Sequence, residues 1–150
     1  MTSRVFNKWT RDRCVKGSIR HGGREFVFYI VKDPPAKSAL GGIIVNDLFF
    51  KTYTKEERVA LLYHEMYHLS RRNCVLQIPR ILRYLSIKKA NYEEEYTADR
   101  HAAKMAGMGH VIGLLKKSQQ LYDKGLVKYN PKTHPTIDER IARLNNLASK

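Results

Sequence analysis

"KEERVALLYHEMYHLSRR", residues 55–72, has the clearest helical pattern in the chain. Four apolar residues recur at the spacing of a single helical face: Val59, Leu62, Met66 and Leu69. Thr54 and Glu57 stand three positions apart, which is typical of a capping box at the start of a helix. The sequence therefore predicts a helix here, with one apolar face packed into the core.

The same segment contains "HEMYH" at residues 64–68. His64 and His68 are four residues apart, so on a helix their imidazoles lie one turn apart on the same side and can bind one cation. Glu65 would flank that cation and could take a proton from a water that the metal activates, which is the role of the glutamate in H-E-x-x-H motifs. The alternative is a chance match on a surface helix, because the motif is short.

Zinc in a hydrolytic site usually has three protein ligands and one open position, so a third ligand is needed. Cys74 stands where longer H-E-x-x-H-x-x-G-x-x-H motifs have their third histidine. Arg71, however, replaces the glycine that permits the tight turn of those motifs. The acidic segment "NYEEEYTAD", residues 91–99, is therefore the better source of the ligand.

Two of the three adjacent glutamates in this acidic segment have structural explanations. Asn91 and Glu94 have the spacing of a helix N-cap. Glu93 would lie in the first helical turn, where the helix dipole favours a negative charge. We therefore expect a helix over about 92–106, and Glu95 is the glutamate left for the metal.

Glu95 shares a helical stripe with three small or acidic residues: Asp99, Ala102 and Ala106. Such a stripe lets this helix approach the 55–72 helix closely and present the Glu95 carboxylate to the metal. Asp99, one turn further along, could accept a hydrogen bond from the far nitrogen of a ligand histidine. Otherwise Asp99 would be a surface carboxylate paired with Arg100 or Lys104.

The remaining segments predict an α+β fold, mainly helical with a small β-sheet. Strands are expected at "EFVFYIV" (25–31) and "GGIIVN" (41–46). Further helices are expected at 75–88, which is basic and amphipathic, at 110–124, ending at Gly125, and at 137–148. The basic segment 1–24 is expected to be a helix or a loose arm.

Composition favours one globular domain, because 150 residues with 43% hydrophobic content can form one core. Lys and Arg number 28 against 14 Asp and Glu, and the net charge of +14 would attract nucleic acid or an anionic membrane surface. No apolar run reaches the roughly 20 residues of a membrane span, and the N-terminus lacks a signal-peptide core. A cytoplasmic protein is therefore expected, with Cys14 and Cys74 as free thiols or a single bridge.

Three separated motifs, in this order, resemble a known family: "HEMYH", "EYTAD" and "THPTIDERIARL". They are similar to those of the zinc metallopeptidase family of the HtpX heat-shock protease and the CAAX prenyl endopeptidases. The resemblance runs from about Gly41 to Arg143. Those relatives are membrane proteins, whereas this chain is closer in plan to the minigluzincins, which are small soluble versions of the catalytic core. The resemblance implies a zincin-like metallopeptidase domain over 1–150, with 25–150 as the catalytic core after the basic segment.

The resemblance also implies roles for particular residues. Zinc would be held by His64, His68 and Glu95. Glu65 would act as general base and acid, and Asp99 would lie behind a ligand histidine. His134 would face the cleft and stabilise the oxyanion or govern access to the metal; otherwise it is a turn histidine before Pro135.

The implied activity is that of a zinc-dependent endopeptidase acting on a peptide or protein substrate. "GGIIVN" would be the edge strand along which an extended peptide adds, although "PPAKSALGG" lacks the Asn-Ala usual before the glycine pair. Some minigluzincins are latent, and here segment 1–24 or the tail could cover the cleft, with a Cys14 thiolate on the zinc as one variant. The oligomeric state stays open, with a homodimer as one option.

A zinc-stabilised basic binding module without proteolytic activity is the alternative function. Structural zinc sites are usually four-coordinate, with Cys and His ligands. This chain instead offers three nitrogen or oxygen ligands with Glu65 alongside, which favours catalysis.

Overall fold

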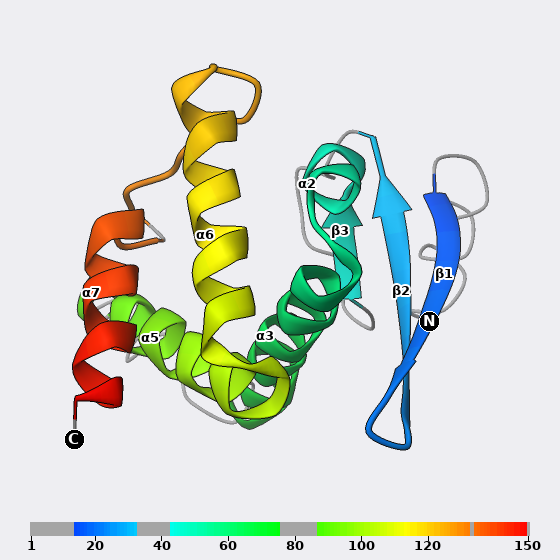
Figure 1. Ribbon diagram of the computed structural model, residues 1–150, viewed down its shortest axis with the longest axis horizontal. Coiled ribbons are helices and arrows are strands. Elements are labelled where there is room, and N and C mark those ends of the chain that lie inside the picture. Colours follow the sequence, from blue (N-terminus) through cyan, green and yellow to red (C-terminus); the bar gives the residue numbers. More distant parts are fainter. Residues whose placement is uncertain (1–13, 33–42, 76–86, 133, 150) are drawn as a thin grey trace. The chain divides into compact units, whose positions relative to one another are not determined.

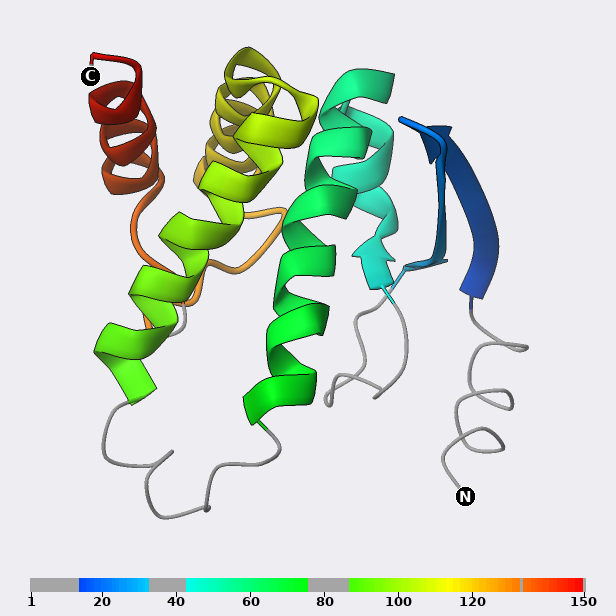
Figure 2. The ribbon, with the colours of Figure 1, turned by 90° about the horizontal axis from the view of Figure 1, so that it is seen from below.

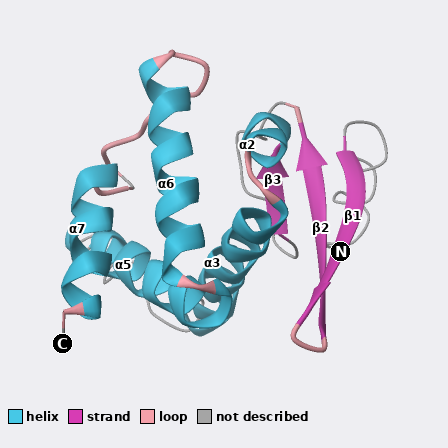
Figure 3. Cartoon of the chain, in the orientation of Figure 1, coloured by secondary structure: helices cyan, strands magenta, loops and turns pink. Residues whose placement is uncertain are grey.

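The computed structural model describes residues 14–32, 43–75, 87–132 and 134–149. They form an α+β structure that is mainly helical with a small three-stranded sheet (Figures 1 and 3). The chain divides into two compact units, Met1–Thr54 and Lys55–Lys150, and the sheet belongs to the first. The predicted fold class is confirmed at this level.

The sheet has the order β1-β2-β3. Strand β1 (Cys14–His21) runs antiparallel to β2 (Arg24–Val31), and β2 runs parallel to β3 (Ile43–Asn46). The strands predicted at 25–31 and 41–46 are therefore confirmed over their described residues. β3 lies at one edge of the sheet, as expected for "GGIIVN".

Strand β1 corrects the prediction of a helix or loose arm over residues 1–24. Gly22 and Gly23 both have positive φ, 56° and 72°, a conformation that glycine adopts readily and that suits a two-residue hairpin turn. This turn pairs Cys14–His21 with Arg24–Val31 along their full lengths. Residues 1–13 lie outside the described part of the chain.

The second unit contains four helices in its described residues: α3 (Lys55–Val75), α5 (Ile87–Ala106), α6 (Met108–Asp123) and α7 (Ile137–Ala148). Helix α3 packs against α5 and α6, and α5 also contacts α7 (Figure 2). The core between them includes Leu62, Tyr63, Ala98, Val111, Leu115 and Leu144. The helices predicted at 55–72, 92–106, 110–124 and 137–148 are confirmed, while the one at 75–88 falls mostly outside the described residues.

Helix ends in this unit follow their local sequence. Gly125, with φ of 66°, ends α6 as predicted. Thr136 caps α7, since its hydroxyl accepts from the Glu139 N–H while the Glu139 carboxylate accepts from the Thr136 N–H. No helix among the described residues is both long and apolar enough to cross a membrane.

The start of α5 contradicts the predicted N-cap at Asn91. The helix begins at Ile87, so Asn91 and Glu94 lie inside it rather than at its first turn. Asn91 therefore cannot cap this helix, and the Glu94 side chain is not needed for a capping box. Glu94 instead reaches a histidine of α3, as described below.

Candidate metal centre

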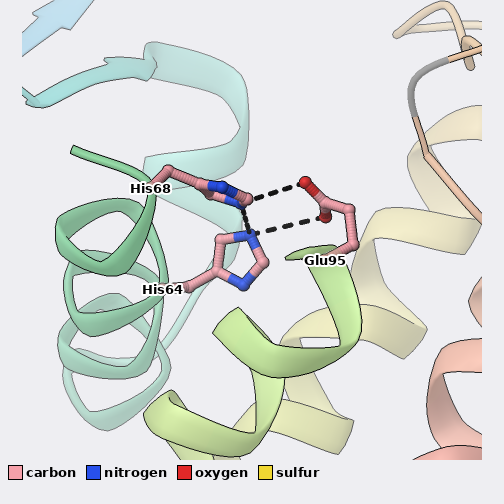
Figure 4. A group of neighbouring side chains, drawn as sticks. All are labelled: His64, His68 and Glu95. Carbon is pink, nitrogen blue, oxygen red and sulfur yellow. Dashed lines mark hydrogen bonds and ion pairs between the residues drawn. The ribbon is translucent and has the colours of Figure 1, made fainter. Parts of the chain in front are cut away.

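Three side chains from two helices converge on one point (Figure 4). His64 and His68 project from α3, and Glu95 projects from α5. The two histidine Nε2 atoms are 3.0 Å apart. Glu95 Oε1 is 3.0 Å from His68 Nε2, and Glu95 Oε2 is 3.5 Å from His64 Nε2. Because one ligand atom from each residue lies within 4.8 Å of the others, the group could hold a metal ion.

Helix geometry and small residues explain this convergence. His64 and His68 are one turn apart on α3, so their rings point the same way. On α5, Ala98 and Ala102 are fully buried, which lets the two helices approach closely. Glu95 itself is only 6% exposed, so its carboxylate is held among protein groups rather than in water.

The fit to a cation is supported by an unsatisfied oxygen. Within the described part of the chain, Glu95 Oε2 is a buried side-chain oxygen with no hydrogen-bond partner. Such groups are rare in folded proteins because desolvation without a hydrogen bond is unfavourable. A cation bound between this carboxylate and the two imidazoles would satisfy it.

A carboxylate contacts the Nδ1 atom of each of the two histidines, on the side of the ring away from the converging Nε2 atoms. His64 Nδ1 is 2.9 Å from Asp99 Oδ1, and His68 Nδ1 is 2.9 Å from Glu94 Oε1. A carboxylate accepts hydrogen bonds, so it favours a proton on Nδ1 and leaves the Nε2 lone pair for a metal. The Asp99 contact was predicted from the sequence, whereas the Glu94 contact was not.

Arg140 of α7 is a further member of the centre that the sequence reasoning missed. Its Nε donates to Asp99 Oδ2 at 2.7 Å, and its Nη2 donates to Asp99 Oδ1 at 2.6 Å. Its Nη1 lies 3.4 Å from Glu95 Oε2. A usable sequence signal existed: Ile137, Arg140 and Leu144 follow a helical spacing, and all three are buried.

Without a metal, these groups form a tightly coupled ion cluster. Burial alone lowers the pKa of His64, but its interactions with the Asp99 and Glu95 carboxylates outweigh burial and raise the pKa to about 10. Burial likewise opposes ionisation of Glu95, yet the two histidines and Arg140 hold its pKa well below the usual range. The Arg140 hydrogen bonds lower the pKa of Asp99 in the same way, against the effect of burial.

Glu65 and His134 lie beside this cluster. Glu65 follows His64 on α3 and is half-buried. Partial burial lowers the pKa of His134 and outweighs the opposing negative charge of Glu95, which favours the neutral ring. His134 Nε2 is 3.7 Å from Glu95 Oε1, and the side chain is 46% exposed.

The loop before α7 holds His134 in this position. The His134 backbone N–H donates to the Asn130 carbonyl at 3.2 Å, and the Tyr129 hydroxyl donates to the His134 carbonyl at 2.8 Å. The structure thus brings His134 next to the predicted ligand Glu95. The side chains of Cys14 and Cys74, the alternative metal ligands, lie outside the described part of the structure.

Comparisons with protein-family models, with curated proteins and with solved structures found no match for this chain. Its function must therefore be inferred from the chemistry of the centre.

Proposed function

We propose that this chain is a zinc-dependent endopeptidase of the gluzincin type, built on a zincin-like fold. The observation that carries the proposal is the convergence of His64, His68 and Glu95, with one ligand atom from each within 4.8 Å of the others. The order of "HEMYH", "EYTAD" and "THPTIDERIARL", which resembles that of the HtpX and CAAX prenyl endopeptidase family, supports the same function.

Zinc is the metal that best suits these donors. Two imidazole nitrogens and one carboxylate oxygen form a donor set of catalytic zinc sites, which leave a further position open for water or substrate. When bound, zinc would polarise the scissile carbonyl and make a water acidic enough to react near neutral pH.

The residues around the centre would perform the proton transfers. Glu65 would accept a proton from the attacking water and pass it to the leaving amine. A neutral His134 would donate a hydrogen bond to the oxyanion that forms on the substrate. Asp99 and Arg140 would keep the His64 ring in the orientation that directs Nε2 toward the centre.

Metal content and peptide hydrolysis, measured together, test this proposal. Purified protein should contain about one zinc per chain and cleave casein or an unstructured peptide, assayed before and after limited trimming of its ends. Glu65→Gln should keep the metal and lose about 10²–10⁴-fold in cleavage rate, the usual contribution of a general base. Glu95→Ala should lose the metal, whereas Glu93→Ala, two residues away on the same helix, should keep both metal and activity. Full cleavage by Glu65→Gln would exclude the mechanism.

The charge of the chain supports a second candidate function. A net charge of +14 favours binding to a polyanion, with the metal centre serving only stability. Salt-sensitive DNA binding at physiological ionic strength, with no hydrolysis by intact or trimmed protein, would favour this basic binding module over the peptidase.

A further inference from the structure

Glu94 contacts the outer side of the second candidate ligand. Its Oε1 is 2.9 Å from His68 Nδ1, the ring nitrogen that faces away from Glu95. Since α5 begins at Ile87, Glu94 lies in the body of the helix and serves no cap. The neighbouring Glu93 points elsewhere: its Oε1 accepts from Arg143 Nη2 at 3.3 Å, and its side chain is 56% exposed. Adjacent glutamates of one helix thus have different partners.

We propose that Glu94 is a positioning residue of the metal centre, which orients the His68 ring through Nδ1 so that Nε2 points at the metal. This inference rests on the proposed metal site. Carboxylates behind metal-binding histidines fix the tautomer and ring orientation, and their loss typically weakens metal binding 10–100-fold. The two histidines of α3 would then be matched by two outer carboxylates of α5, Asp99 for His64 and Glu94 for His68.

Asp99 and Glu94 differ in their burial and in their other hydrogen bonds. The Asp99 side chain is 2% exposed and held by two hydrogen bonds from Arg140, so removing it would disturb both the fold and the metal. The Glu94 side chain is 28% exposed. Removing Glu94 should therefore weaken metal binding with little effect on the stability of the metal-free protein. Loss of metal affinity at Glu94 can therefore be measured without loss of the fold.

Zinc affinity, measured by competition with a chromophoric chelator, provides the main test. We expect Glu94→Ala to bind zinc about 10–100-fold more weakly than wild type, while Glu93→Ala binds it normally. Glu94→Gln should recover most of the lost affinity, because its amide oxygen can still accept a hydrogen bond from Nδ1. Substitution with Co²⁺ adds an independent readout: its visible absorption spectrum should change in Glu94→Ala and remain unchanged in Glu93→Ala. Thermal unfolding of the metal-free variants should be similar.

The outcomes separate this inference from the proposed function. If wild-type protein binds no zinc, the metal centre and the peptidase proposal both fail. If wild type binds zinc but Glu94→Ala matches Glu93→Ala in zinc affinity and cobalt spectrum, the role of Glu94 is overturned and the metal centre stands. A Glu94→Gln variant as weak as Glu94→Ala would also overturn it, because the hydrogen-bond acceptor is retained there.

Discussion

Arg140 shows how a single buried charge can organise a polar centre. It lies on the face of α7 that Ile137 and Leu144 direct into the core, and it is only 7% exposed. A buried guanidinium is tolerated when its donors are satisfied, and here two of them bind Asp99 in a bidentate pair. The pair fixes Asp99, and Asp99 in turn contacts His64.

Replacing Arg140 by methionine should destabilise the metal-free protein by about 3 kcal/mol, since it removes one partner of a buried ion pair. This destabilisation is at the low end of the range for losing one partner of a buried ion pair, because His64 remains as a partner of Asp99. Urea unfolding of purified protein measures the change. Arg143→Met is the matched control: this arginine is on the same helix, but it is 57% exposed and pairs with Glu93 at 3.3 Å. Its loss should change the unfolding free energy by about 1 kcal/mol or less. Equal effects of the two substitutions would contradict the structural role of Arg140.

At the scale of elements, α7 depends on a narrow apolar face to present Arg140. Leu144 is 1% exposed, whereas Leu147, one turn further along the same helix, is 41% exposed. The capping box of Thr136 and Glu139 fixes where the helix begins. Packing of Leu144 therefore controls how firmly Arg140 is held against α5.

Leu144→Ala should destabilise the protein by about 2–5 kcal/mol, the usual effect of truncating a buried leucine. Leu147→Ala should change stability by about 0.5 kcal/mol or less, as expected for a surface substitution. Denaturant unfolding of both variants gives the comparison. A loss at Leu147 as large as that at Leu144 would show that α7 packs through a different face.

Helices with strong hydrophobic periodicity were predictable from the sequence. The proposed ligands and Asp99 could then be identified from their positions on those helices. His64 and His68 needed only the helical spacing, and Glu95 with Asp99 needed only a second helix in contact. The carboxylate of Glu94 was assigned to a cap because the helix was expected to begin near residue 92 rather than at Ile87. Local sequence could not show that Arg140 would meet an aspartate 41 residues away. The Gly22–Gly23 turn, by contrast, was a hairpin signal that could have been recognised.

For the whole molecule, the candidate metal centre lies entirely within the Lys55–Lys150 unit. The outer carboxylates and Arg140 belong to the same unit. A metal bound only by the folded protein adds to its stability, by about 2.7 kcal/mol when the free metal is at a hundred times its dissociation constant. Metal binding and folding of this unit should therefore be linked.

Zinc should stabilise the protein more at pH 8 than at pH 6. In the metal-free fold the pKa of His64 is raised to about 10, so the metal must displace a proton, and its affinity rises with pH. The raised pKa also stabilises the metal-free fold fully below the ordinary value of 6.5, and this contribution declines as pH rises toward about 10. Proton displacement therefore enlarges the zinc-induced increase in Tm at higher pH, while the metal-free protein itself becomes less stable over the same range. Thermal unfolding with and without zinc at the two pH values measures it.

Glu95→Ala provides the control for this measurement, because it removes a proposed ligand and should abolish the zinc-induced increase in Tm at both pH values. An increase in wild type that is equal or smaller at pH 8 would contradict proton displacement from His64.

The compact placement of the centre has a consequence for protein design. One turn of α3 would supply both nitrogen donors, and residues 94–99 of α5 supply the carboxylates that His64 and His68 contact within the described part of the chain. A single arginine from a third helix, Arg140, forms ion pairs with both Glu95 and Asp99. Six side chains on three short helical segments could therefore be grafted onto an unrelated helical bundle with the same helix spacing. Metal uptake by such a graft would show how much of the centre is portable and how much requires the rest of this protein.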